Sequence, residues 1–330
     1  MNTAEFIQKW QKALAAYGTP ADFTDSTTYR FSIVECYGEI HPFVISKAIN
    51  YERRRQLMSQ QKPYIPKQDD YPSEIWDILP CFLCENVAQA FDAIRGVEKD
   101  VEETDNLIEE IGDYFILPNR YPSQVGHSLL VPKNHDDATN RTNGLHIEEG
   151  KIRGNIVTSE NLDLVIESCE RNRMGAVRNH VLDGMSIPNH DHYHLMFDWM
   201  PGLALVEYVI ERPEETEYDE NIFFAENTPF DTLVIKGDIP EIDIPKITAP
   251  ILKRMELSNE VYTLVYFRGN LLISPRHKEA VGETRIDVQG YGLAGLPIHS
   301  IGAEDYTAFL KQAVRFMPLR GEYDWSRFMG

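Results

Sequence analysis

The stretch NHVLDGMSIPNHDHYHLMF, residues 179–197, carries the pattern that decides the fold. Side chains alternate in character from His190 to Phe197, and this alternation predicts a β-strand. Residues two apart in a strand project from the same face of a sheet. The imidazoles of His190, His192 and His194 are therefore expected to point the same way.

Three imidazoles on one strand face suit phosphoryl chemistry. A neutral imidazole is a nucleophile at about pH 7, and the phosphoramidate that it forms can pass its phosphoryl group on. Neighbouring imidazoles can ligate a metal ion, or donate hydrogen bonds to phosphate oxygens and so stabilise charge in the transition state. Two alternatives stay open at this point: a chance cluster of histidines, and a metal site built from these three side chains alone.

The flanking sequence predicts mainly antiparallel strands. Two apolar runs that end in proline, 114–118 and 128–132, enclose a turn at 119–122 and predict a hairpin with a long connection. A serine start, an early glutamate and helical apolar spacing predict a helix over 159–173. Further candidates are a helix at 4–17, strands at 230–235, 261–267 and 271–273, and a helix at 305–316. Together these elements predict an α+β fold, an antiparallel sheet with flanking helices.

Length and charge exclude several classes of protein. The chain has 330 residues, enough for one large domain or two ordinary ones, and a formal net charge of -20. An acidic surface repels a phosphate backbone, so we expect no extended nucleic-acid binding. Residues 1–18 predict an amphipathic helix rather than a signal peptide, and no apolar run reaches the roughly 18 residues of a membrane span. A cytoplasmic protein without a membrane partner is expected.

Two segments of the chain resemble the histidine-triad (HIT) superfamily. One is NHVLDGMSIPNHDHYH, residues 179–194, and the other joins NRYP, residues 119–122, to GHSLLVPKNH, residues 126–135. Chain length and a CxxC pair make the chain similar to the large branch, which includes galactose-1-phosphate uridylyltransferase, diadenosine tetraphosphate phosphorylase and GDP-L-galactose phosphorylase. The resemblance covers about residues 80–198. It implies a HIT-like antiparallel sheet with flanking helices, with room for a second HIT-like half.

The resemblance also implies a domain plan. We expect residues 1–198 to form a HIT-like nucleotidyl-transfer domain with an N-terminal helical extension. Residues 199–330 would form an α+β half that completes the substrate site. Within that half, the proline-rich stretch 239–250 predicts an internal linker.

Five residues acquire roles from the resemblance. His192, the middle histidine of the triad, is the nucleophile, and His194 at the third position contacts phosphate. Asn179 and Ser186 line the site of the α-phosphate. Asn119 faces the nucleoside.

The chain departs from the superfamily pattern at two positions. Ser186 lies four residues before His190, where many members have three. His194 stands where the large transferases usually carry glutamine, as it does in small hydrolases of the superfamily. Outside the resemblance, Arg276 follows a strand candidate and is a candidate ligand for substrate phosphate or sugar, with a solvated turn as the alternative.

The CxxC pair predicts a structural metal site. Several members that resemble this chain bind zinc through residues that correspond here to Cys81, Cys84, His135 and His190. Two thiolates and two imidazoles form a closed tetrahedral zinc site. Alternatives are a redox pair, two unbound buried thiols, or His127 in place of His135 as the third ligand.

The expected function is nucleotidyl transfer from a nucleotide-sugar or a dinucleoside polyphosphate, through a covalent nucleotidyl-histidine, to phosphate or a sugar phosphate. Two rivals are a HIT-type phosphoanhydride hydrolase and a non-catalytic, zinc-stabilised nucleotide-binding protein. A redox or metal-carrier protein built on the CxxC pair is a third. The expected partners are small molecules, and a homodimer is possible.

Overall fold

The structure is a computed structural model of residues 1–330, and the part of the chain that it describes falls in several ranges. These are 1–16, 27–36, 39–48, 106–119, 122, 125–133, 146–148, 151–153, 157–180, 191–198, 206–207, 210, 213–216, 218–225, 228, 230–237, 243–258, 260–277 and 317–329.

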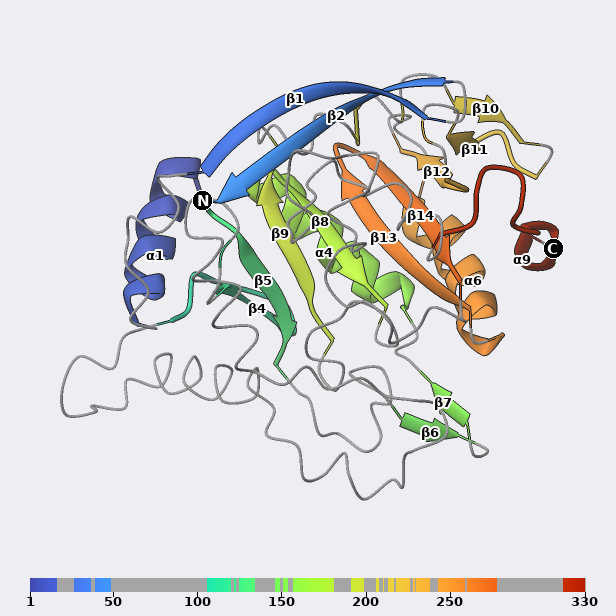
Figure 1. Ribbon diagram of the computed structural model, residues 1–330. Helices are drawn as coiled ribbons and strands as arrows, with labels where there is room; N and C mark the ends of the chain where they lie inside the picture. The colour runs from blue at the N-terminus through green and yellow to red at the C-terminus, as the bar shows by residue number, and fades with distance from the viewer. Residues whose placement is uncertain are drawn as a thin grey trace.

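A ten-stranded sheet forms the centre of the structure (Figure 1). Its order is β10-β11-β12-β14-β13-β8-β9-β5-β4-β3, and neighbouring strands pair antiparallel throughout. The strands are β3 (Glu109–Ile111), β4 (Tyr114–Pro118), β5 (Ser128–Pro132), β8 (Met174–Asn179), β9 (Tyr193–Phe197), β10 (Pro213–Glu215), β11 (Ile222–Ala225), β12 (Leu233–Lys236), β13 (Val261–Phe267) and β14 (Asn270–Arg276). The predicted fold class, an antiparallel sheet with flanking helices, is confirmed.

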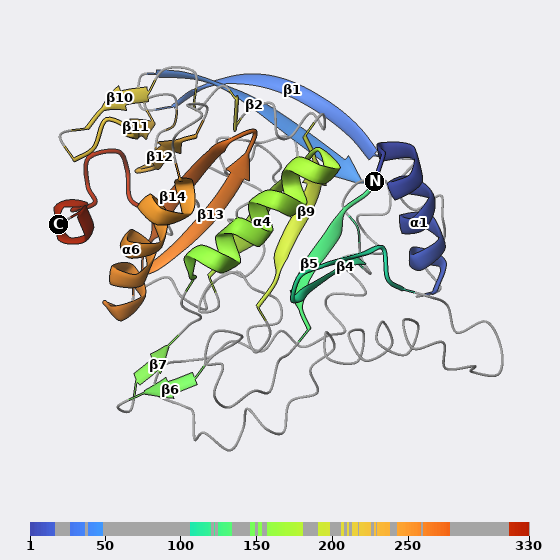
Figure 2. The same cartoon turned by 180° about the vertical axis from the view of Figure 1, so that it is seen from behind.

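The remaining described elements are two small sheets and four helices. A long ribbon pairs β1 (Thr27–Cys36) with β2 (Glu39–Ala48), and in both views it runs along one end of the large sheet, from α1 towards β10 (Figures 1 and 2). The other small sheet pairs β6 (His146–Glu148) with β7 (Lys151–Arg153). The helices are α1 (Thr3–Ala16), α4 (Ser159–Asn172), α6 (Ile244–Leu257) and α9 (Ser326–Met329). Among the described residues, no helix is long and apolar enough to cross a membrane.

The order of the large sheet contains the same unit twice. The chain passes through β3, β4 and β5, then α4, and returns as β8 and β9, which gives the order β3-β4-β5-β9-β8. It then passes through β10, β11 and β12, then α6, and returns as β13 and β14, which gives β10-β11-β12-β14-β13. The two units meet where β8 pairs with β13. Strand β14 therefore holds, in the second unit, the place of β9 in the first. The division into domains at residue 198 stays a prediction.

Helices α4 and α6 lie on the same face of the sheet (Figure 2). Helix α4 begins where the Thr158 hydroxyl accepts a hydrogen bond from the Asn161 amide at 3.2 Å, and it ends at Arg173, which has a left-handed φ of 55°. Apolar side chains of both helices pack with those of alternate strand residues and form one core. Its members include Leu162, Val165, Leu252, Met255, Ile116, Leu130, Leu195, Leu264 and Ile273. The predicted helix at 159–173 is therefore confirmed.

The predicted linker at 239–250 is wrong, because α6 begins inside it. The Asp243 carboxylate caps the helix by accepting from the Lys246 amide at 3.1 Å. Pro245 lies in the first turn, where the missing N–H costs nothing. Pro250 lies in the interior, where it removes one backbone hydrogen bond. Burial of the apolar face of α6 against the sheet offsets that loss.

The face of the sheet opposite α4 and α6 is also buried. A second apolar cluster on this face includes Val177, Met196, Val265 and Leu272. Because side chains alternate along a strand, residues two or four positions from these lie on the same face. His194, Asn179 and Arg276 meet this condition, so the predicted site belongs to the face opposite the helices.

Candidate active site

Two histidines of the predicted triad lie together at the start of β9. His192 immediately precedes the strand and is 2% exposed, while His194 lies within it and is 9% exposed. Their ring centroids are 5.1 Å apart in a T-shaped arrangement. His190 lies outside the described residues.

A third histidine, which sequence reasoning considered only as a metal ligand, joins this pair. His127 precedes β5 and is fully buried. Its Nε2 lies 3.0 Å from Nδ1 of His194 and 3.1 Å from Nδ2 of Asn119. The Trp10 indole N–H fixes the same segment by donating to the His127 carbonyl at 3.0 Å. The structure therefore brings together Asn119, His127, His194 and His192.

Asn179 and Arg276 extend this group across the sheet. The β8–β9 register pairs Val177 with His194, and Asn179 ends β8 two residues beyond Val177, on the same face of the sheet. Asn179 pairs on its other side with Thr263 of β13. The Arg276 guanidinium donates to the Thr263 hydroxyl at 3.3 Å. Asn179 and Arg276 are both buried, so polar groups form a row over neighbouring strands within a buried face.

A buried polar network lies behind this row, on the helix side of the sheet. The Arg178 guanidinium donates through Nε to the Asp191 carboxylate at 3.0 Å, and both side chains are buried. Further along, the Glu256 carboxylate contacts His180 at 3.1 Å and accepts from the Tyr262 hydroxyl at 2.7 Å.

Charge on this network keeps Arg178 a cation. Burial alone would lower the pKa of Arg178, but the carboxylate of Asp191, with other groups nearby, raises this pKa well above its usual value. Burial, followed by the charge of Asp191, raises the pKa of Tyr193 above its ordinary range. The side of β8 and β9 that faces the helices therefore holds a fixed charge pair and a neutral phenol.

Five predicted site residues are not among the residues that the structure describes. Ser186, His190 and the three other predicted zinc ligands, Cys81, Cys84 and His135, lie outside the described residues. Within the ranges that the structure does describe, no group of three or more potential metal ligands is found.

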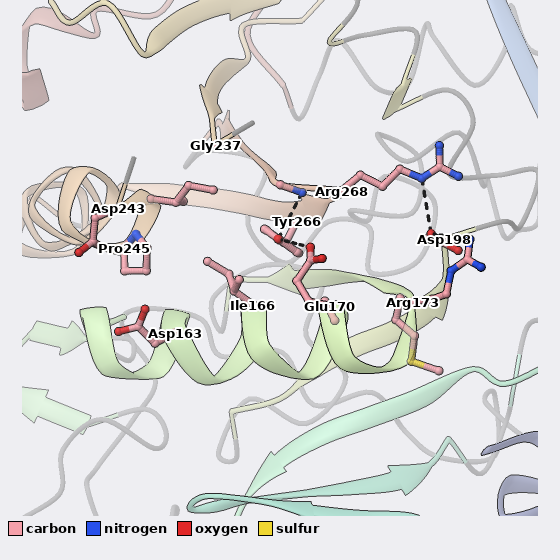
Figure 3. A pocket seen from close by; sticks show the side chains of 14 residues that line it. Asp163, Ile166, Glu170, Arg173, Asp198, Gly237, Asp243, Pro245, Tyr266 and Arg268 are labelled. Carbon is pink, nitrogen blue, oxygen red and sulfur yellow. Dashed lines mark hydrogen bonds and ion pairs between the residues drawn. The ribbon is translucent and has the colours of Figure 1, made fainter. Parts of the chain in front are cut away.

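A pocket of about 820 Å³ lies away from the histidines, between α4, α6 and the turn that joins β13 to β14 (Figure 3). Arg268 and Arg173 both face the Asp198 carboxylate, at 3.5 and 3.8 Å. The wall of the pocket includes Met174, the first residue of β8. Asn179, which belongs to the histidine row, is the last residue of the same strand. Five residues of strand separate these positions by about 17 Å. The pocket is therefore distinct from the histidine row.

Solved structures of similar architecture match nearly the whole chain. Three of them are of yeast Ap4A phosphorylase Apa2, each 12% identical to this chain. One has a TM-score of 0.55 and covers 98% of both chains. The complex with AMP has a TM-score of 0.53 and covers 94% of both, and the complex with Ap4A has 0.54 and covers 94% of this chain and 95% of the other.

At 12% identity, this likeness shows a shared fold. No family model matches the sequence, and no curated protein matches it.

Proposed function

We propose that this chain is a nucleotidyltransferase of the phosphorylase type, which cleaves a dinucleoside polyphosphate or a nucleotide-sugar through a covalent nucleotidyl group on His192. The observation that carries the proposal is the buried row in which His127, His194 and His192 adjoin one another, with Asn179 alongside. The shared fold with yeast Ap4A phosphorylase, solved with AMP and with Ap4A, supports a dinucleoside polyphosphate as the first substrate to test. The HIT-type motifs support the same superfamily.

The reaction needs two in-line displacements. In the first, a ring nitrogen of His192 forms a bond to the α-phosphorus as the bond from phosphorus to the bridging oxygen breaks, and the leaving nucleotide departs with that electron pair. In the second, an oxygen of inorganic phosphate attacks the same phosphorus, the P–N bond breaks, and the imidazole regains its lone pair. Positioning and charge stabilisation supply most of the catalysis in such a reaction.

His127 sets the hydrogen-bonding state of His194. The Asn119 amide nitrogen is a donor, so Nε2 of His127 accepts from it and presents the same lone pair to Nδ1 of His194. His194 then carries a hydrogen on Nδ1. A second hydrogen on its Nε2, present in the imidazolium form, can donate to a phosphate oxygen as negative charge develops there.

Burial of the site favours transfer over hydrolysis. The His192 ring is almost fully buried, and a site closed to bulk water protects a reactive phosphoramidate until the acceptor arrives. The rival reaction, hydrolysis, is favoured by His194, since the large transferases usually carry glutamine there. Arg276 is the buried cation of the row and suits the phosphates of substrate or acceptor.

The acceptor can be identified from the products. With Ap4A as the probe, transfer of the AMP group to phosphate gives ADP and ATP, whereas transfer to water gives AMP and ATP. We expect ADP and ATP, with turnover at least about tenfold faster in the presence of phosphate. Product masses distinguish the two reactions. Equal turnover without phosphate, with AMP as product, would establish the hydrolase, and binding of Ap4A without turnover would establish a nucleotide-binding protein.

A structural zinc ion is the second part of the proposal. Cys81, Cys84, His135 and His190 offer the two thiolates and two imidazoles of a closed tetrahedral site, which would stabilise the fold and leave no position for catalysis. Because His190 is two residues from His192, the ion would also anchor one end of the triad strand.

Metal analysis tests the zinc site. We expect about one zinc per chain by elemental analysis, and a fall in melting temperature after chelation because ligand binding stabilises the native state. The Cys169→Ser variant is the matched control, since Cys169 is a buried thiol in α4 outside the predicted site. Cys81→Ser should lose the zinc, and Cys169→Ser should keep it. The opposite result, with zinc lost from Cys169→Ser and retained by Cys81→Ser, would contradict the assignment.

A further inference from the structure

The backbone ladder between β8 and β9 ends just short of the reactive histidine. Its last pair joins Val177 to His194. Asn179 and His192, the next residues on the same face, each lie two residues beyond this pair. The separation of Asn179 and His192 therefore depends on interactions other than backbone pairing that hold the segment before β9 against β8.

The tie is an ion pair on the reverse side of the sheet. Arg178 precedes Asn179, and Asp191 precedes His192. The two charged side chains therefore lie on the opposite face of the sheet from the two site residues. Nε of Arg178 donates to Oδ1 of Asp191 at 3.0 Å. The Arg178 side chain is 0% exposed and that of Asp191 is 4% exposed.

The ion pair leaves buried polar atoms without hydrogen-bond partners. Nη1 and Nη2 of Arg178 are buried without a hydrogen-bond partner, and so is the hydroxyl of Tyr193, two residues after Asp191. A buried ion pair with unsatisfied donors is often less stabilising than an apolar pair of the same size. A directional bond between β8 and the segment before β9 is therefore a more specific reason than stability for charges at these two positions.

We propose that Arg178 and Asp191 are positioning residues, whose ion pair holds the segment that carries His192 against β8 and so fixes the His192 ring relative to Asn179. This inference rests on the proposed function of His192. A displacement of about 1 Å at a nucleophile lowers a reaction rate by up to about 100-fold. The ion pair therefore acts on the reaction through geometry, without contact with the substrate.

The test compares variants of the ion pair with a control variant nearby. Asp191→Asn and Arg178→Lys each weaken the tie, and Glu256→Gln alters an equally buried carboxylate that bonds to His180 and Tyr262 on the same side of the sheet. We expect the single-turnover rate of nucleotidyl-His192 formation from Ap4A to fall about 10–100-fold in both ion-pair variants. The dissociation constant for AMP should stay within about threefold of the wild-type value, because neither side chain faces the ligand. Glu256→Gln should lower the melting temperature and leave the rate within about threefold.

A second measurement does not depend on the reaction. Hydrogen exchange at the backbone amides of residues 191–193 should accelerate at least about tenfold in Asp191→Asn, and remain unchanged in β13. Unchanged exchange in both ion-pair variants would overturn the proposal. So would a wild-type single-turnover rate per folded molecule, or an equal loss of rate in Glu256→Gln, which would indicate a purely structural role. If Asp191→Asn does not fold, Arg178→Lys, which keeps the charge, decides the matter by the same two measurements.

Failure of the proposed function would look different. If the wild-type protein forms no adduct and turns over no nucleotide, the role of His192 is wrong. The exchange measurement then still decides whether the ion pair holds the segment.

Discussion

Replacing His192 with alanine is expected to lower the rate of nucleotidyl transfer by about 10⁴-fold or more, because the variant has no atom to form the P–N bond. The fold should survive, since the His192 ring is one buried side chain next to His194 at the end of a strand rather than within the ladder. Intact-mass measurement after incubation with Ap4A should show an added nucleotidyl group on the wild-type protein and none on His192→Ala.

The matched control is His180→Asn. His180 is buried like His192, but it contacts Glu256 and Tyr262 on the helix side of the sheet. We expect this variant to be less stable and to keep transfer within about threefold of the wild-type rate once corrected for folded protein. Turnover by His192→Ala at the wild-type rate would refute the covalent mechanism.

Replacing Gly126 with alanine is expected to reduce the free energy of unfolding by about 2–5 kcal/mol, the largest stability effect that we predict. Gly126 has a φ of +76°, and a Cβ there would lie 2.2 Å from Cε2 of Phe197. The left-handed backbone costs about 1–2 kcal/mol for alanine, and forced repacking costs about 1–3 kcal/mol more. Phe197 cannot easily yield, because it is fully buried and packs edge-on against Phe6 with ring centroids 5.5 Å apart.

Gly321→Ala separates the two costs. Gly321 has a similar φ of +83°, but its Cβ would meet nothing within 4 Å. Thermal or urea unfolding should therefore show a loss of about 1–2 kcal/mol for Gly321→Ala, clearly smaller than that for Gly126→Ala. Equal losses would mean that packing against Phe197 contributes nothing. Because Gly126 precedes His127, we also expect Gly126→Ala to lower the transfer rate.

Local patterns in the sequence predicted much of the first unit. The apolar runs at 114–118 and 128–132 are β4 and β5, and the alternation after His190 is β9. These predictions succeeded because period-two alternation and terminal prolines act within a few residues. The stretch 261–267 in the second half was predicted for the same reason and is β13.

Features that depend on distant residues were missed. Sequence reasoning assigned His127 no role beyond that of an alternative metal ligand, because its partner in the site, His194, is 67 positions away. The contact between Arg178 and Asp191 likewise joins residues that are 13 positions apart. The linker at 239–250 was predicted from its prolines, but tertiary burial of one face made α6 a helix despite Pro250.

The doubled order of the sheet sets two units of one design side by side, with different side chains at equivalent places. Strand β9 begins beside histidines, whereas β14, in the equivalent place, reads NLLISPR and has none. If the proposed reaction holds, a dinucleoside polyphosphate offers two identical ends to a protein whose two halves are unlike. The β8–β9 side alone carries the proposed nucleophile, so a symmetric molecule that reacted there would be split into two different products.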